Sequence, residues 1–461
     1  MSPAIGSMFT SLHVRNYRLY ASGQIVSLTG TWMQTTAQDW LVLDLSHNSG
    51  TALGVVTALQ FTPILLLTLW AGALADRFDK RKALIATQSF SMLLALGMGL
   101  LVVTGTAALW HVYVFALLLG TVNAFDTPIR QAFVSELVGP DRLPNAVSLN
   151  SATFNSARLL GPAVGGLVIA AVGVGPAFLI NGASYVAVLL GLFAMRPADL
   201  LRNVNPVVGG RGRVREGLRF VRGRPDLMLV VAMMLVLGTL GLNFNLTLPL
   251  LSKVEFKVGA ALFGLLNAAF AAGALVGALV GARRTTRPSA TWVLSFAAAF
   301  GILECAVALA PGFIYAVVIL VPTGAFFIAH NNAANARVQL GTPAHLRGRV
   351  MSLYMLVFLG GTPIGSLIVG PISQRYGPRA GLLLGGVAVL LAAITLAAAR
   401  ARRRAPAAPP PTADAEPVGA DVEAVALGEG TAVGAPLPAR THRVTKPHGP
   451  HAAGTSPALR C

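Results

Sequence analysis

The chain has few charged residues and only two cysteines, and these shortages exclude several classes of protein. Charged residues are 11% of the 461 positions, against roughly 25% in an average soluble domain, so a soluble globular protein is a poor fit. Cys305 and Cys461 provide neither a disulfide framework nor the spacing of a metal site. No Gly-x-x-x-x-Gly-Lys-Ser/Thr loop is present, which argues against ATP-driven work by this chain alone.

Long apolar runs dominate the sequence instead. Hydrophobic residues make up 54% of the chain, and the mean hydropathy is +0.68. A helix that crosses the ~30 Å hydrocarbon layer needs ~20 mostly apolar residues, because each residue rises ~1.5 Å. About twelve runs meet this requirement, which predicts an all-α membrane protein with twelve transmembrane helices. The predicted spans are 18–43, 50–75, 83–104, 109–135, 144–171, 175–195, 226–251, 258–282, 289–309, 312–338, 348–371 and 379–399.

The basic residues lie between these runs, and their distribution predicts the orientation. The formal net charge of +18 is not gathered in one dense patch, so nucleic acid is not an expected partner. If the N-terminus is cytoplasmic, the inward loops are strongly basic and include eight arginines in 196–224. This asymmetry predicts a multi-pass membrane protein with both termini cytoplasmic. The outward loops would carry only Lys253, Lys257, Arg375 and Arg379.

Composition divides the chain into five parts. Residues 1–17 have no signal-peptide pattern and are expected to be a short cytoplasmic segment. Six spans are predicted in 18–195 and six in 226–399, and 196–225 is a basic cytoplasmic connector between them. Residues 400–461 contain too few large apolar side chains for a core and are expected to be a disordered cytoplasmic tail.

Local matches between the two halves indicate an internal repeat. The matches pair Gly72-Ala73-Leu74-Ala75 with Gly277-Ala278-Leu279-Val280, Gly161-Pro162 with Thr362-Pro363, and Gly175-Pro176 with Gly377-Pro378. They follow the same order, and their separations lie between 201 and 205 residues. An offset of six spans returns the chain to the same side of the membrane, which predicts two parallel six-helix bundles with a site between them.

The loop after the second predicted span has the most specific local pattern. It reads Gly72-Ala73-Leu74-Ala75-Asp76-Arg77-Phe78-Asp79-Lys80-Arg81-Lys82 and resembles the signature loop of the major facilitator superfamily. In that family an aspartate engages charges on neighbouring helix ends and acts as a latch between conformations. The alternative, in which the basic residues only enforce orientation, leaves Asp76 unexplained. Asp79 replaces the family's second glycine, and the resemblance implies a conformational latch of Gly72, Asp76, Arg77 and Arg81.

Two further motifs resemble branches of the same superfamily. Residues 158–166 of the fifth span resemble its antiporter motif, with ordinary glycine and proline use in a packed helix as the alternative. Residues 123–133, 136–138 and 143–146 look like the bacterial exporters that include enterobactin and macrolide efflux proteins. The resemblance covers about residues 10–400. It implies a major-facilitator-type fold and a place in the bacterial cytoplasmic (inner) membrane. The antiporter-type residues are Gly161, Pro162, Gly165 and Gly166.

Polar residues form stripes on the first and fifth predicted helices. Gln24, Ser27, Thr31, Gln34 and Gln38 are three or four residues apart, which places them on one helix face. The fifth span has a similar stripe, and lipid is an unfavourable neighbour for either, so both helices are expected to line an aqueous path. Hydrogen bonding between packed helices is the alternative. The expected cavity-lining residues are Gln34, Gln38, Asn123, Asn155, Arg158, His330 and Asn331.

Ionisable groups within the spans need a partner or a cavity, because each costs ~2.5–3.5 kcal/mol at the span centre. Asp126 and Arg130 are four residues apart, which predicts an ion pair and favours a structural role for both. A desolvated acid or a histidine can titrate during a transport cycle. The candidates for proton coupling are Asp39, Asp126, Glu304 and His330.

Two functional hypotheses follow from the fold that the resemblance implies. The first is an exporter of a small hydrophobic molecule, such as a drug or siderophore, that works by alternating access and proton antiport. The second is a proton-coupled nutrient importer of the same fold, and a transporter-like membrane sensor is a further rival. The eight histidines are scattered, so no enzyme, catalytic residue, metal or cofactor is expected. The expected partners are a small-molecule substrate, protons and membrane lipid.

Overall fold

The computed structural model describes residues 9–75, 78–201, 213–282 and 288–404. Within these ranges the regular structure is helical, without a strand. Eleven of the described segments are long and apolar enough to cross a membrane. The first predicted span corresponds to α2 (Arg15–Leu45), which has 31 residues but carries many polar side chains. Its length suffices for a ~30 Å layer at ~1.5 Å per residue, and the predicted all-α membrane fold is confirmed.

The first half contains six long helices. It begins with a short 3-10 helix, η1 (Thr10–His13), and ends before a 3-10 turn, η2 (Pro197–Asp199), and the helix α8 (Arg213–Arg222). The six helices correspond to the first six predicted spans. They are α2, α3 (Gly50–Ala75), α4 (Lys80–Val103), α5 (Leu109–Val138), α6 (Leu143–Val172) and α7 (Val174–Ala194).

The second half begins with a span that is not one regular helix. It consists of α9 (Pro225–Val236), the π-helical segment η3 (Leu237–Gly241), α10 (Phe244–Leu250) and the π-helical segment η4 (Leu251–Glu255). π-helical turns are rare and are frequent at functional sites. The remaining helices are α11 (Ala260–Ala282), α12 (Ala290–Ala308), α13 (Phe313–Gly341), α14 (Ala344–Tyr376) and α15 (Pro378–Arg404).

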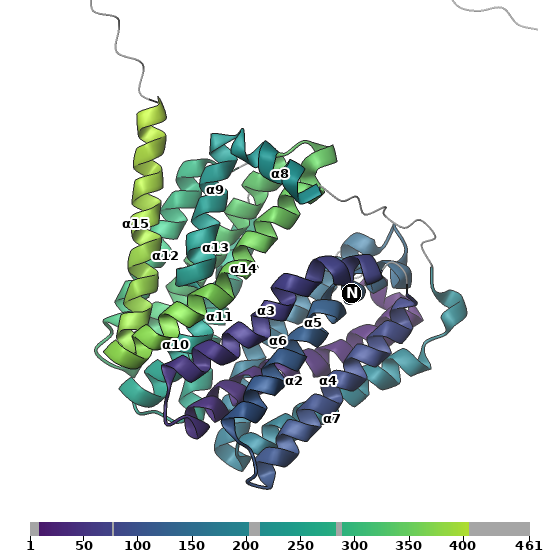
Figure 1. Ribbon diagram of the computed structural model, residues 1–461. Coiled ribbons are helices and arrows are strands. Elements are labelled where there is room, and N and C mark those ends of the chain that lie inside the picture. Colours follow the sequence, from purple (N-terminus) through teal and green to yellow (C-terminus); the bar gives the residue numbers. More distant parts are fainter. Residues whose placement is uncertain (1–8, 76–77, 202–212, 283–287, 405–461) are drawn as a thin grey trace, which may run out of the picture. The chain divides into compact units, whose positions relative to one another are not determined.

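The helices form two groups that follow the two halves of the sequence (Figure 1). In the first half α2 packs on α6 and α7, α3 packs on α5, and α4 packs on α5 and α7. The second half repeats this pattern, because η3 packs on α14 and α15, α11 packs on α13, and α12 packs on α13 and α15. Helices six spans apart therefore have equivalent neighbours, and the two predicted parallel six-helix bundles are confirmed.

Equivalent glycines end the fifth and eleventh spans. Gly173 follows α6 and Gly377 follows α14, and both have φ of +89°. Glycine adopts this left-handed conformation at little steric cost. The next helix consequently starts at once, at Val174 and at Pro378, so the repeat extends to the backbone conformation of its turns.

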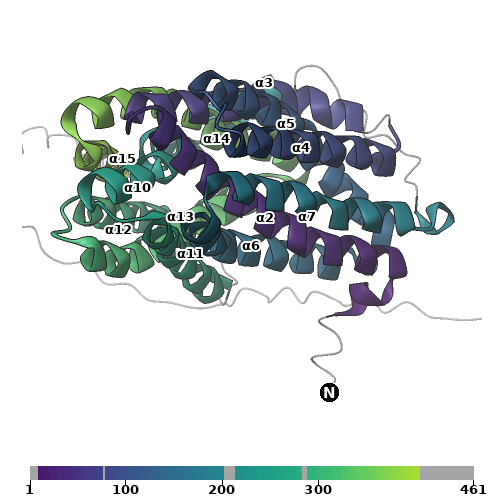
Figure 2. The same cartoon turned by 90° about the horizontal axis from the view of Figure 1, so that it is seen from below.

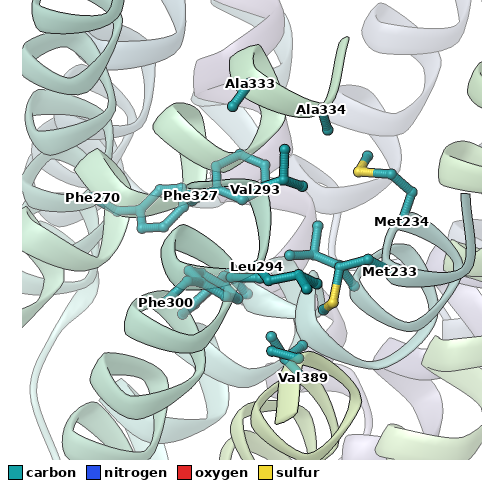
Figure 3. Packing of buried hydrophobic residues seen from close by; sticks show 14 of the residues in the cluster. Met233, Met234, Phe270, Val293, Leu294, Phe300, Phe327, Ala333, Ala334 and Val389 are labelled. Atoms are coloured by element: carbon teal, nitrogen blue, oxygen red, sulfur yellow. The ribbon is translucent and has the colours of Figure 1, made fainter. Parts of the chain in front are cut away.

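An aromatic cluster anchors the second bundle. Lipid tails are as apolar as leucine, so membrane helices associate through close packing and hydrogen bonds more than through removal of apolar surface from water. Phe327 of α13 lies 5.8 Å from both Phe270 of α11 and Phe300 of α12, measured between ring centroids (Figure 3). Phe244 of α10 joins the cluster at 4.8 Å from Phe270. The cluster fixes α10 and α11 relative to each other.

The two halves meet along α3 with α14 and along α6 with α11, and Figure 2 shows α6 beside α11. We name the end at which α2 begins the proximal end, and the opposite end the distal end. Gly54, near the distal start of α3, faces Ser366 of α14. Gly166, in the distal half of α6, faces Ala260 at the distal start of α11. These glycine contacts hold the halves together toward the distal end.

Candidate functional site

A cavity of about 100 Å³ lies between the two halves. Helices α2 and α6 form its first-half wall. The second-half wall comes from α10, α11 and the break before α10, where Leu242 has non-helical dihedral angles (φ −108°, ψ 43°). The lining residues are Trp32, Thr35, Thr36, Asp39, Arg158, Pro162, Leu242, Phe244, Asn245, Asn267, Phe270 and Ala271.

Two opposite charges face this cavity. Asp39 of α2 is 7% exposed, and no described residue forms a hydrogen bond or ion pair with its carboxylate. The guanidinium carbon of Arg158 lies 5.7 Å from the centroid of the Trp32 ring, which is a cation–π contact. Asn245 and Asn267 add amide groups from the second half. One ligand could therefore meet a carboxylate, a guanidinium, amides and aromatic faces.

On the distal side of the cavity the halves are joined by a cluster that we name the distal seal, formed by Trp40, Asp44, Lys253 and Phe263. The rings of Trp40 and Phe263 stack with their centroids 6.0 Å apart. Lys253 Nζ lies 4.9 Å from the Trp40 ring centroid and also forms an ion pair with Asp44. The seal links α2 to η4 and α11, so opening the distal side requires these contacts to break.

The antiporter-type motif lies where α6 packs between α2 and α11. A Cβ atom on Gly161 would be 2.4 Å from a side-chain carbon of α2, and one on Gly165 would be 3.0 Å from an α2 carbonyl oxygen. On the other side, a Cβ atom on Gly166 would be 2.5 Å from an α11 carbonyl oxygen. A Cβ atom on Gly264 of α11 would in turn be 2.5 Å from the carbonyl oxygen of Pro162. Larger side chains would therefore separate the three helices.

The polar stripe of α2 does not face the cavity in this structure. Asn181 Nδ2 of α7 donates a hydrogen bond to Gln34 Oε1 at 2.7 Å, and Gln38 Nε2 donates to Gln60 Oε1 of α3 at 3.3 Å. Gln34 and Gln38 are each 2% exposed. Packing between helices satisfies these amides, so the expectation that this stripe lines an aqueous path is corrected. The adjacent face of α2, which carries Asp39, lines the cavity instead.

The polar stripe of α6 is exposed along its proximal part. Ser148, Ser151 and Asn155 are exposed, and the next member of the stripe, Arg158, lines the cavity. Asn155 Nδ2 donates to the carbonyl oxygen of Ser151 at 2.8 Å. Polar surface of this kind is unfavourable against lipid, which supports a hydrated route between the proximal end and the cavity.

Three other residues expected at the cavity lie elsewhere among the described helices. His330 is fully buried, and its Nδ1 is 2.8 Å from the carbonyl oxygen of Val293 on α12. Asn331 Oδ1 accepts a hydrogen bond from the Tyr354 hydroxyl of α14 at 2.9 Å. Asn123 is partly buried on α5. Neither His330, Asn331 nor Asn123 lines the described cavity. His330 Nδ1 and Asn331 Oδ1 are directed into contacts with α12 and α14 instead.

The predicted ion pair between Asp126 and Arg130 is confirmed. Thr87 Oγ1 and Gln88 Nε2 of α4 donate to Asp126 Oδ1 at 2.7 and 2.8 Å. Arg130 Nη1 also donates to Gln24 Oε1 of α2 at 2.7 Å. The pair therefore ties α2, α4 and α5 together and is a structural element of the first bundle.

Glu304 belongs to the second bundle and lies outside the cavity. It is 2% exposed, and its Oε2 has no hydrogen-bond partner among the described residues. A Cβ atom on Gly385 would be 2.6 Å from Glu304 Oε1, so the carboxyl group packs directly against α15. Of the four candidates for proton coupling, Asp39 is the one that lines the cavity.

The predicted latch is described only in part. Asp76 and Arg77 lie outside the described residues, and Gly72 belongs to the proximal end of α3. Arg81, at the start of α4, donates from Nε and Nη2 to two carbonyl oxygens in the last turn of α7, at 2.7 and 3.3 Å. The last carbonyls of a helix lack partners within the helix, so Arg81 caps the proximal end of α7.

Most of the residues that line the cavity were not among the cavity-lining residues expected from the sequence. Of the residues expected to line a cavity, only Arg158 does so, together with Asp39 and Pro162 from the other predicted groups. Asn245 and Asn267 carried a usable signal, because an amide inside an apolar span needs a partner or a cavity. For an aromatic residue such as Trp32, the residue type alone does not show whether the side chain lines a cavity or packs in a hydrophobic core.

Two equivalent helix bundles with a cavity between them define a membrane transporter of the major facilitator type. A solved structure with this fold is a bacterial homologue of the human lysosomal transporter Spinster, in an inward-facing and occupied conformation. The TM-score is 0.66 at 16% sequence identity, and the match covers 84% of this chain and 97% of that one. Residues 6–423 match the family model described as transmembrane secretion effector, and the chain belongs to this family.

Relatives of known name are also transporters. The staphyloferrin A transporter of Staphylococcus aureus (strain NCTC 8325 / PS 47) is 29% identical over 266 residues, which are 57% of this chain and 66% of that protein. The enterobactin exporter EntS of Escherichia coli O1:K1 / APEC is 26% identical over 70% of this chain and 79% of that protein. The predicted resemblance to bacterial exporters of the major facilitator superfamily is confirmed. The chain is a multi-pass membrane transporter of a small molecule, and its relatives are not enzymes.

Proposed function

We propose that this chain exports a small hydrophobic molecule, of the drug or siderophore type, across the bacterial cytoplasmic membrane in exchange for protons. The observation that carries the proposal is the cavity between the halves, in which Asp39 and Arg158 face the same space without pairing to each other. The basic loops favour a cytoplasmic proximal end, which supports the proposal that both termini are cytoplasmic.

The described conformation supports the cytoplasm-facing step of an alternating-access cycle. The distal seal is formed, and the exposed stripe of α6 leads from the proximal end toward Arg158. A substrate would reach the cavity along this stripe. Release to the other side would then need the distal seal to open and the proximal ends of the halves to approach each other.

Asp39 is the proposed proton site. Its carboxylate has no described partner, so a proton or a polar group of the substrate can bind it. An ionised Asp39 balances the charge of Arg158, whereas a protonated Asp39 leaves the cavity with one net positive charge. Proton binding from the distal side would thus follow release of the substrate, and substrate binding from the cytoplasm would favour release of the proton.

The test compares two acid-to-amide variants in everted membrane vesicles with an acidic interior. Enterobactin, staphyloferrin A and erythromycin are added one at a time, and proton release is followed with a pH-sensitive dye. At least one substrate is expected to release protons with the unaltered chain. Asp39→Asn is expected to abolish the release, and the matched variant Glu304→Gln, at a buried acid outside the cavity, is expected to retain it.

The possible outcomes separate the parts of the proposal. Loss of proton release in Glu304→Gln with full release in Asp39→Asn would refute the assignment of Asp39. Uptake of a substrate into intact cells, driven by the proton gradient, would reverse the proposed direction and identify an importer. Absence of proton release for every substrate would count against proton antiport.

A further inference from the structure

We propose that the proximal end of the second bundle binds one anionic phospholipid, with its phosphate at Arg400 and its acyl chains in two grooves beside α15. Both grooves lie away from the cavity between the halves. The proposal therefore does not depend on the substrate or on the direction of transport.

The two grooves lie on either side of the last turns of α15. The first groove, of about 390 Å³, runs between α12 and α15, and small side chains such as Ala298, Ala393 and Ala397 keep it open. The second groove, of about 290 Å³, runs between α9 and α15 and has Leu229 and Leu396 in its wall. Each groove thus offers an apolar channel along a helix, which is the shape that an acyl chain needs.

Arg400 is the charged residue that the two grooves share. Its Nη1 donates a hydrogen bond to Thr291 Oγ1 at 2.7 Å, which holds the guanidinium at the proximal end of α12. The second groove also contains Arg337 and Asp226, which lie 3.5 Å apart. Two arginines and one aspartate leave a net positive charge, so the grooves converge on a site that suits an anion.

Helix ends add to this positive potential. Both α9 and α12 begin at the proximal end, with Asp226 and Thr291 in their first turns. The start of a helix carries a partial positive charge of about half a unit and favours phosphate groups. Arg402 follows Arg400 on α15 and is exposed, and each basic residue close to the membrane surface contributes ~1 kcal/mol toward binding of anionic lipid.

The surface around the grooves is apolar and exposed, which identifies lipid as its neighbour. Ile394 and Leu391 of α15 are 54% and 56% exposed, and Trp292 at the start of α12 is 47% exposed. Tryptophan is enriched at the membrane–water interface, where lipid phosphates lie. A free phosphate ion would match the charge of Arg400 but would leave both apolar grooves unfilled, so the proposed ligand is a phospholipid.

Native mass spectrometry of the detergent-purified full chain tests the charge requirement. Dioleoyl phosphatidylglycerol is titrated against dioleoyl phosphatidylcholine, which has the same chains and no net charge. The unaltered chain is expected to prefer the anionic lipid, and Arg400→Ala is expected to bind it about fivefold more weakly. The matched variant Arg402→Ala, which removes the same charge outside both grooves, is expected to change the affinity less than twofold. Equal losses in both variants would show general attraction to a basic helix end and overturn the proposal.

A second pair of variants tests the grooves themselves. Ala397→Phe fills the first groove, whereas Ala398→Phe adds the same bulk at an exposed position outside both grooves. Only Ala397→Phe is expected to weaken phosphatidylglycerol binding, and sodium phosphate is not expected to displace the lipid. Retained binding in a folded Ala397→Phe protein, or displacement by phosphate alone, would overturn the proposal. Circular dichroism and size-exclusion chromatography of each variant establish that it is folded.

Discussion

Lys253 makes both polar contacts of the distal seal, so Lys253→Gln should favour opening of the distal side. The Lys253 and Asp44 side chains are 19% and 48% exposed, and an ion pair of this exposure contributes ~0.2–1 kcal/mol. The contact of Lys253 with Trp40 adds ~0.5–1 kcal/mol. Loss of both contacts should shift the equilibrium by ~1–2 kcal/mol, which raises the population of the distally open state by about 5–30-fold.

Cysteine alkylation measures this population, because a cavity residue reacts from the distal side only while the seal is open. Thr35→Cys provides the target, in a background with Cys305→Ala and Cys461→Ala, and a membrane-impermeant maleimide is applied from the distal side. Thr35 lines the cavity. The rate of labelling is expected to rise about 5–30-fold in Lys253→Gln. Pro311→Cys, exposed in the distal loop between α12 and α13, first establishes which membrane face is distal.

Lys257→Gln is the matched control, because it removes the same charge from an exposed residue at the same end of the bundles. Its labelling rate is expected to stay within twofold of the unaltered chain. An unchanged rate in Lys253→Gln, or an equal increase in Lys257→Gln, would show that the contacts of Lys253 do not hold the halves together and would refute this account of the seal.

Four further substitutions test other parts of the structure. Gly264→Leu should lower vesicle transport at least about tenfold, because its Cβ would be 2.5 Å from a carbonyl oxygen of α6 and overpacking costs ~1–3 kcal/mol; unchanged transport would contradict the packing. Asp126→Ala leaves the paired arginine without its carboxylate and should destabilise the protein by about 3 kcal/mol, seen as a lower Tm. Arg81→Ala should cost about 1 kcal/mol through loss of hydrogen bonds to a helix end, also measured as Tm. Asp76→Asn should abolish export at normal membrane abundance, and retained export would remove the latch assignment.

The fold was predictable because its main determinants are local in sequence. Apolar runs of sufficient length predicted the spans, and glycines such as Gly173 and Gly377 lie at the turns between them. The irregular seventh span was not predictable in the same way. Its π-helical segments lie in an apolar run. The two glycines of Leu237–Gly241 do not predict the irregularity, because glycine is also frequent in regular membrane helices.

The candidate site was predictable mainly where charge was involved. Asp39 and Arg158 stood out because ionisable residues are unfavourable in lipid. The glutamines of α2 have the polar spacing that is also expected of a helix that lines a cavity. Their hydrogen-bond partners instead lie on other helices, as Asn181 of α7 does for Gln34. Helix rotation decides between these outcomes, and a single sequence does not determine that rotation. The distal seal was also missed. Trp40 and Phe263 are far apart in the chain, and a single sequence does not show that their rings meet.

The π-helical segments make the two walls of the cavity mechanically unequal. The hydrogen bond of a π turn spans five residues instead of four, so the turn contains one more residue than an α-helical turn. Conversion of the π turn to an α-helical turn would therefore rotate the following part of the helix by about 100°. Such a turn immediately precedes Leu242 and Phe244, whereas the equivalent span of the other half, α2, is unbroken. Two copies of one design thus enclose the cavity with a continuous helix on one side and an interrupted helix on the other.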